Sequence, residues 1–299
     1  MSGKQLPFTG SCVALVTPFR DGEVDYQSLD RLITFHLQNH TDAILVCGTT
    51  GESATLTEQE RNEIVRFTVS HVNHRIPVIV GTGSNVTSHA ISLSRDAEKC
   101  GADGLLLVTP YYNKTSQAGL VRHYEMIAGH TDLPCILYNV PSRTGMSILL
   151  ETYQALSKVP NIVATKEASG NLSLAADIIQ TCGGDLWVYS GEDKLDVSIM
   201  KTGAKGCISV LADVVPDLVH QMMDLCFANQ YEKAEEIQFS LIPLLNALFM
   251  EVNPIPVKAA MKQMNLCNDE LRMPLWPLND EQQKELAKVL SSYHLIRTI

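Results

Sequence analysis

The sequence predicts an α/β fold, namely a (β/α)8 TIM barrel with a C-terminal helical extension. Three observations predict it: the chain has 299 residues, short apolar runs recur up to residue 210, and helix-like segments separate these runs. A barrel takes about 250 residues, so the length leaves room for one barrel and an added helical layer. We therefore expect residues 1–228 to form the barrel domain and residues 229–299 to form helices packed on it.

Eight runs rich in leucine or β-branched residues predict the strands of the barrel. Each is almost continuously apolar, which suits a strand buried on both faces of a parallel sheet. Their starts lie roughly 20 to 35 residues apart, enough for one helix and two loops. The runs are 12–16, 43–47, 77–81, 104–108, 134–139, 161–166, 186–190 and 206–210.

Helix signals fill the intervening segments. An apolar face follows Asp25, and Thr57 with Glu60 forms a capping-box pattern ahead of another. A doubly wound open sheet is the strongest alternative, but the even spacing and the lack of a strand-linked GxGxxG motif favour the barrel. After residue 211 the strand signal ends, and four segments are expected to be helical: 217–228, 231–250, 256–264 and 280–293.

Composition narrows the class of protein. The net charge of -10 argues against a nucleic-acid-binding surface, which would need a basic face. No apolar stretch approaches the roughly 18 residues of a membrane span. The eight cysteines are scattered without a CxxC pair, which predicts reduced core thiols in a cytoplasmic protein. The nine histidines show no HxH or HExxH spacing, so we expect no metal site.

Lys166 is the most informative polar residue, because it ends the apolar run 161–166. Active sites of such barrels lie at the carboxyl ends of the strands. Burial there disfavours the ammonium form and favours a free amine, which condenses with ketones and aldehydes. We predict a Schiff-base lysine. The alternative is a structural ion pair with Glu52 or Glu167, in a barrel that only binds a metabolite or a partner.

Other strand ends supply groups that such chemistry needs. Tyr138 ends the fifth run, where a phenol can donate and accept the protons of imine formation. Thr49 could pass the proton on, together with a second tyrosine. Thr50 offers a hydroxyl and a backbone N–H to a carboxylate. Arg143 lies on a predicted loop bounded by proline and glycine, and its guanidinium suits bidentate binding of a carboxylate. Taken singly, these residues also fit a plain turn, packing aromatics or a surface salt bridge.

Five motifs together resemble the dihydrodipicolinate synthase (4-hydroxy-tetrahydrodipicolinate synthase) family. The resemblance covers essentially the whole chain. It implies a barrel, commonly a homotetramer, that condenses pyruvate with L-aspartate 4-semialdehyde in lysine and diaminopimelate biosynthesis, with a covalent Schiff base and no cofactor. The motifs are GTTGESATL (48–56), TPYYN (109–113), YNVPSRTG (138–145), TKEASGNL (165–172) and NPIPVK (253–258).

The family's catalytic roles carry over to matching positions of this sequence. Lys166 resembles the Schiff-base lysine, and Tyr138 resembles the general acid and base. Thr49 and Tyr112 resemble its proton-relay partners. The resemblance implies that Tyr112 enters the site of a neighbouring subunit.

The family's substrate-binding roles carry over in the same way. Thr50 resembles the residue that holds the pyruvate carboxylate, and Ile208 resembles the residue beside it on the eighth strand. Arg143 resembles the residue that guides the carboxylate of the semialdehyde. The alternative within this superfamily is a sugar-acid aldolase such as N-acetylneuraminate lyase, which usually lacks an arginine in that loop.

Some bacterial members of the family are inhibited by lysine at a subunit interface. Glu58 and His89 depart from the pattern of the most sensitive members, which have histidine and glutamate at these two positions respectively. Because the two residue types are exchanged, the charge balance could survive, and the sequence leaves feedback inhibition open. The residues that match the lysine site are Ser53, Ala54, Asn85 and Tyr111.

Overall fold

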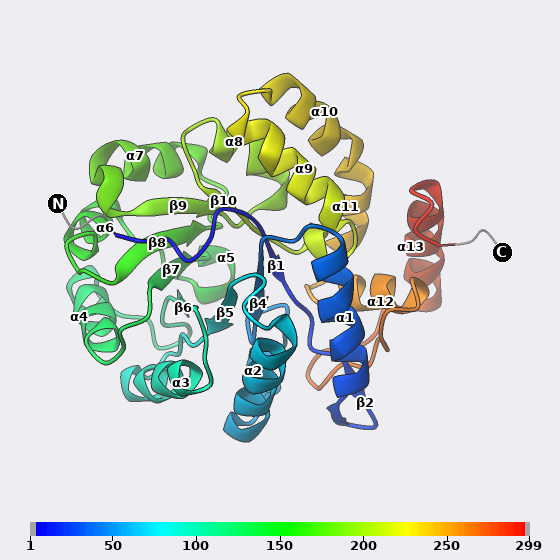
Figure 1. Ribbon diagram of the computed structural model, residues 1–299, viewed down its shortest axis with the longest axis horizontal. Coiled ribbons are helices and arrows are strands. Elements are labelled where there is room, and N and C mark those ends of the chain that lie inside the picture. Colours follow the sequence, from blue (N-terminus) through cyan, green and yellow to red (C-terminus); the bar gives the residue numbers. More distant parts are fainter. Residues whose placement is uncertain (1–3, 297–299) are drawn as a thin grey trace.

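The computed structural model describes residues 4–296, and eight parallel strands form a closed barrel in it (Figure 1). Each strand pairs with its neighbour along the chain, and β1 closes the barrel by pairing with both β4 and β10. The predicted fold class and all eight predicted strands are confirmed. The strands are β1 (Gly10–Ala14), β4 (Ala43–Val46), β5 (Val78–Gly81), β6 (Gly104–Val108), β7 (Cys135–Asn139), β8 (Ile162–Glu167), β9 (Trp187–Ser190) and β10 (Gly206–Ser209).

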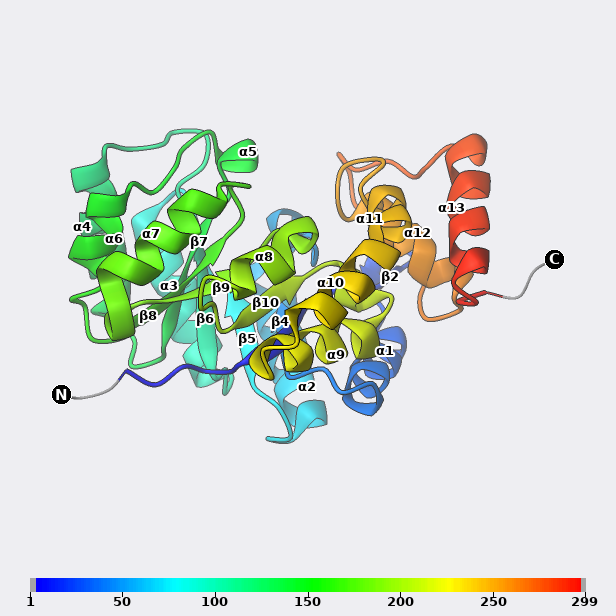
Figure 2. The ribbon, with the colours of Figure 1, turned by 90° about the horizontal axis from the view of Figure 1, so that it is seen from above.

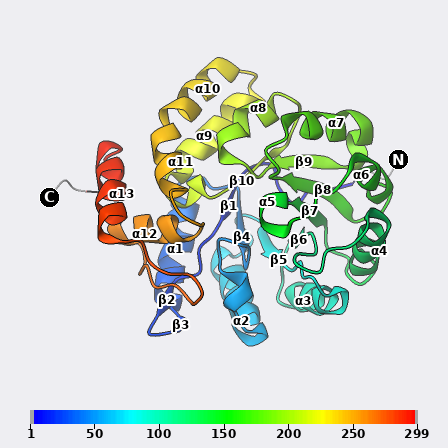
Figure 3. The same cartoon turned by 180° about the vertical axis from the view of Figure 1, so that it is seen from behind.

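Helices surround the barrel, and all but the last of them, which follows β10, lie between one barrel strand and the next (Figures 1 and 3). Asp25 caps the first by accepting from the backbone N–H of Ser28, and the capping box of Thr57 with Glu60 is present at the second. The main helices are α1 (Tyr26–Gln38), α2 (Glu58–Val72), α3 (Thr87–Lys99), α4 (Gln117–Ala128), α6 (Leu150–Leu156), α7 (Leu172–Cys182), α8 (Asp196–Met200) and α9 (Pro216–Phe227).

Side chains fill the barrel interior below the strand ends. Phe8 precedes β1, and its ring stacks on Tyr189 with 4.3 Å between ring centroids. The hydroxyl of Tyr189 donates to the Phe8 carbonyl oxygen at 2.6 Å. Ile136 and Ile208 belong to the same buried cluster. The interior is thus a packed core, so space for a ligand is left at the carboxyl ends of the strands.

Up to residue 296, four further helices follow the barrel and lie beside it (Figure 2). We predicted a single helix over 231–250, and this was wrong in one respect. The helix is interrupted at Leu241, because Pro243 has no N–H to donate and fits only the first turn of a new helix. The helices are α10 (Tyr231–Ser240), α11 (Ile242–Leu248), α12 (Ile255–Gln263) and α13 (Asp280–Ser292).

A small hairpin also belongs to the fold. An antiparallel hairpin of β2 (Phe19–Arg20) and β3 (Glu23–Val24) precedes α1, and the apolar runs gave no sign of it. All eight cysteines are buried and free, as expected. Over residues 4–296, no helix has the length and apolar character that crossing a membrane requires.

Candidate active site

A cavity of about 280 Å³ opens at the carboxyl ends of the strands. Five residues singled out from the sequence line it, although they come from four separate segments of the chain. The strand-end rule therefore located the cavity correctly. These five residues are Thr49, Thr50, Tyr138, Arg143 and Lys166, and the other lining residues used below are Gly191, Glu192, Asp193 and Asn253.

Lys166 lies on β8 with 5 % of its surface exposed. It is in register with Tyr138 on the neighbouring strand β7, and its Nζ lies 4.6 Å from the centroid of the tyrosine ring. Both side chains line the cavity. A primary amine and a phenol therefore face the same small space.

The alternative ion pair of Lys166 with Glu52 or Glu167 is wrong. Glu167 is the next residue on β8 and points to the opposite face of the barrel wall, where its carboxylate accepts from the hydroxyl of Tyr153 at 3.1 Å. Glu52 pairs with Lys258 at 2.7 Å. Among residues 4–296, no carboxylate oxygen lies within 4.0 Å of the Lys166 amine.

Gly191 makes room for the lysine stem. A Cβ at this position would lie 2.6 Å from Cε and 2.7 Å from Cγ of Lys166, closer than carbon atoms approach one another. The residue follows β9 directly, so the strand-end rule could have found it.

Two acidic residues line the cavity beside the amine. Asp193 is buried, and its Oδ2 accepts from the backbone N–H groups of Val210 and Leu211 at 3.1 and 3.0 Å. Burial raises the pKa of both Asp193 and Glu192, whereas the positive charge of Lys166 lowers each. The amine is therefore attracted by negative charge at longer range, without being held in an ion pair.

Arg143 lies in a one-turn helix, α5 (Pro141–Thr144), and not in the loop that we predicted. Pro141 at the first helical position presets the backbone, and Gly145 ends the turn with φ +69°. The guanidinium is exposed at the rim, and its Nη2 donates to the Asn253 carbonyl oxygen at 3.2 Å. The short helix orients the cation towards the cavity mouth.

Asn253 is a lining residue to which the sequence analysis gave no role. Its Nδ2 donates to Thr50 Oγ1 at 3.0 Å, and both residues are buried. Within the described part of the chain, Asn253 Oδ1 is buried without a donor. The motif NPIPVK contained this signal, since an asparagine before a proline in the extension has no obvious role in helix packing.

Thr49 lies close to Tyr138, since both residues line the cavity and a smaller pocket beside it. Tyr112 and Ile208 do not line the cavity of a single chain. Tyr112 is 92 % exposed and has φ +67°, a conformation rarely adopted by a bulky residue. Ile208 is 1 % exposed and lies in the barrel interior.

A second cavity of about 670 Å³ adjoins the first and shares Thr49 and Arg143 with it. The exchanged residues Glu58 and His89 both line it, and His89 Nε2 lies 3.3 Å from Glu58 Oε1. Asn85 does not line it; its carbonyl oxygen accepts from Asn113 at 2.9 Å. Of the four residues that match the family's lysine site, those that line this cavity are Ser53, Ala54 and Tyr111.

The closed parallel barrel and the amine at its mouth define a barrel enzyme of the lyase (aldolase) class. The chain belongs to the dihydrodipicolinate synthetase family, whose model matches residues 7–293. The sequence resemblance to this family is thereby confirmed.

Individual relatives agree over nearly the full length. The 4-hydroxy-tetrahydrodipicolinate synthase of Geobacter sulfurreducens is 49% identical over 97% of this chain and 100% of its own length. The crystal structure of dihydrodipicolinate synthase from Aquifex aeolicus has a TM-score of 0.95 and 44% identity, covering 98% of this chain and 100% of that one. A chloride-inhibited dihydrodipicolinate synthase from Acinetobacter baumannii, complexed with pyruvate, has a TM-score of 0.94 and 41% identity, covering 96% and 99%.

Proposed function

We propose that the chain is a 4-hydroxy-tetrahydrodipicolinate synthase, which condenses pyruvate with L-aspartate 4-semialdehyde in lysine and diaminopimelate biosynthesis. One observation carries the proposal: the Lys166 amine faces the cavity with no carboxylate within 4.0 Å among residues 4–296. A primary amine that no carboxylate contacts is free to attack a carbonyl carbon.

In the proposed reaction, Lys166 attacks the keto carbon of pyruvate and forms a carbinolamine. Loss of water gives the imine, and loss of a methyl proton gives the enamine. The enamine carbon then attacks the aldehyde carbon of the semialdehyde, whose oxygen takes up a proton. The amino group of the semialdehyde attacks the restored imine carbon, which closes the ring and releases Lys166. The protonated imine stores the electron pair that would otherwise reside on carbon, so we expect the reaction to need no cofactor.

Tyr138 is the proposed proton carrier of these steps, because it lines the cavity and its ring centroid lies 4.6 Å from the lysine Nζ. It would protonate the carbinolamine oxygen and accept a proton when the enamine forms. Thr49 lines the same space and is the proposed relay partner. Tyr112 would complete the relay from a second chain.

Two groups can hold the substrate carboxylates. Thr50 is a buried lining residue, and we assign it to pyruvate; the family resemblance implies the same substrate for Ile208. Arg143 lies at the rim, and we assign it to the semialdehyde. Thr50 is buried and Arg143 is exposed, which suits a reaction in which the ketone must reach Lys166 first.

We infer a homotetramer in which Tyr112 is shared between subunits. An aromatic side chain that is 92 % exposed in a left-handed conformation is costly in an isolated chain, and a partner subunit would cover it. The eight free thiols suit the reducing cytoplasm, where we place the enzyme. Sedimentation velocity at several protein concentrations tests the assembly.

Borohydride trapping tests the proposed function. Pyruvate with borohydride should add a stable mass to the tryptic peptide that contains Lys166, and omission of pyruvate should leave the peptide unmodified. An adduct on any other lysine, or no adduct, would refute the assignment. Condensation with the semialdehyde should also exceed cleavage of N-acetylneuraminate; the reverse order would favour a sugar-acid aldolase.

A further inference from the structure

A buried ion pair links the C-terminal extension to the loop that follows β4. Lys258 of α12 and Glu52 of this loop lie 2.7 Å apart between Nζ and Oε1. Their side chains are 0 % and 1 % exposed. Glu52 comes two residues after Thr50, so the pair holds the same turn that carries the predicted carboxylate-binding residue.

Every charged atom of this pair has a partner. The Lys258 amine also donates to the Glu270 carbonyl oxygen, and it lies 4.3 Å from the ring centroid of Phe19. The second oxygen of Glu52 accepts from the backbone N–H of Arg272 at 3.0 Å. Removing either partner would leave a buried charge without compensation, so the pair acts as one unit.

The backbone at Glu52 is in a conformation that a free loop would avoid. Its φ is +53°, in the left-handed region that residues with a Cβ rarely adopt. Such a conformation persists only where the surroundings hold it. Here the side chain is fixed by Lys258, which thereby fixes the direction of the turn after Thr50.

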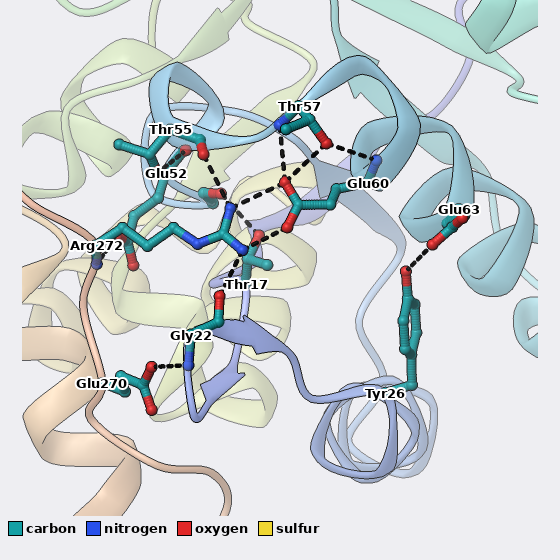
Figure 4. Close-up of polar contacts among 11 residues, drawn as sticks. Thr17, Gly22, Tyr26, Glu52, Thr55, Thr57, Glu60, Glu63, Glu270 and Arg272 are labelled. Carbon is teal, nitrogen blue, oxygen red and sulfur yellow. Dashed lines mark hydrogen bonds and ion pairs between the residues drawn. The ribbon is translucent and has the colours of Figure 1, made fainter.

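The extension holds the far end of the same loop as well (Figure 4). Arg272 reaches across from the extension and donates through Nη1 to the Thr55 carbonyl oxygen and to Glu60 Oε2, both at 2.9 Å. Asn253 donates to Thr50 Oγ1 at the cavity itself. The loop is therefore held by the extension at its start, middle and end.

We propose that the Lys258–Glu52 pair is a positioning device that holds Thr50 in place to bind the pyruvate carboxylate. Stability alone does not call for such a pair, because apolar replacements of buried ion pairs are often neutral or stabilising. What a charged, fully hydrogen-bonded pair adds is a fixed geometry. The inference rests on the proposed function, since it names pyruvate as the ligand of the held turn.

The test uses the full chain with the double substitution Glu52→Gln/Lys258→Met, which removes both charges and keeps an acceptor for the Arg272 N–H. We expect the folded variant to raise the KM for pyruvate about tenfold while kcat changes less than about threefold. Lys262→Met is the matched control, because Lys262 lies on the same helix in a more exposed ion pair with Asp269. It should leave the KM within about twofold.

A double-mutant cycle separates positioning from general loosening of the fold. If the pair acts through Thr50, its removal in a Thr50→Val background should add less than about twofold to the KM for pyruvate. A tenfold rise there, or a wild-type KM in the folded double variant, would overturn the inference. If the double variant does not fold, Glu52→Gln alone is measured against the same thresholds, with the same two outcomes.

The two proposals fail differently. If the wild-type protein is not trapped by pyruvate and borohydride, the proposed function is wrong. If the wild-type protein is trapped and turns over, but the KM is insensitive to the pair, only the positioning role is wrong.

Discussion

Two lysines are both buried beside an aromatic ring, but they differ in whether a carboxylate contacts the amine. Lys166 is 5 % exposed with its amine 4.6 Å from the ring centroid of Tyr138, and Lys258 is 0 % exposed with its amine 4.3 Å from that of Phe19. Among residues 4–296, Lys258 has a carboxylate partner, Glu52 at 2.7 Å, and Lys166 has none within 4.0 Å. Burial and an aromatic neighbour therefore do not distinguish a reactive amine from a structural one; the absence of a contacting carboxylate does.

The largest effect should follow from removing the amine of Lys166. We expect Lys166→Met to lower kcat by about 10⁴-fold or more, because the imine is assigned to Lys166. Lys194, the other lysine that lines the cavity, is exposed. The free energy of unfolding should stay the same or rise by roughly 1 kcal/mol, since the variant replaces a buried amine that has no ion-pair partner. Steady-state kinetics and urea unfolding measure the two quantities. A variant that retains a tenth of the activity would contradict the assignment.

Lys258→Met should show the reverse pattern. The substitution leaves the Glu52 carboxylate buried without its partner, so we expect a loss of about 3–5 kcal/mol in the free energy of unfolding. The variant should still be trapped by pyruvate and borohydride, because Lys166 is intact. Urea unfolding and mass spectrometry of the trapped protein provide the two readings. If Lys258→Met and Lys166→Met have equal free energies of unfolding, the ion pair with Glu52 does not distinguish the two lysines.

Arg143→Ala tests whether the cavity rim serves the second substrate. The guanidinium is exposed, and among residues 4–296 its one hydrogen bond is to the Asn253 carbonyl oxygen, so stability should change little. Loss of a bidentate carboxylate contact should raise the KM for the semialdehyde roughly 10- to 100-fold. Trapping with pyruvate alone should proceed at nearly the wild-type rate. Equal losses for both substrates would rule out the role given to Arg143.

The sequence predicted the barrel almost completely, because strands buried on both faces read as continuous apolar runs. It also located Lys166 and Tyr138, since a polar residue that ends such a run must lie at the barrel mouth. It could not show which lysine lacks a partner. Lys258 pairs with a residue 206 positions away, and no local pattern encodes that contact.

The sequence analysis missed other site residues for the same reason. Asn253 and Gly191 matter through Thr50 and Lys166, which are distant in sequence and close only in the folded chain. The helix interruption at Leu241 could have been predicted from Pro243. The one-turn helix that contains Arg143 is too short to show a periodic pattern of apolar residues. Tyr112 lies outside the cavity of one chain, so neither sequence nor fold places it without a second subunit.

The smallest expected effect concerns the ion pair between Arg272 of the extension and Glu60 of α2. Hydrogen bonds from Arg272 lower the pKa of Glu60 from 4.5 to about 2 (Figure 4). A carboxyl group with a lowered folded-state pKa contributes stability above pH 4.5 that is lost as the pH falls towards 2. After allowance for solvent screening, we expect this contribution to be about 1–2 kcal/mol. Urea unfolding at pH 7 and at pH 3 should therefore show a smaller loss in Glu60→Gln than in the wild-type protein. Other carboxyl groups titrate alike in both proteins and cancel in the difference. An equal loss in the two proteins would show that the Arg272–Glu60 contact does not stabilise the folded protein.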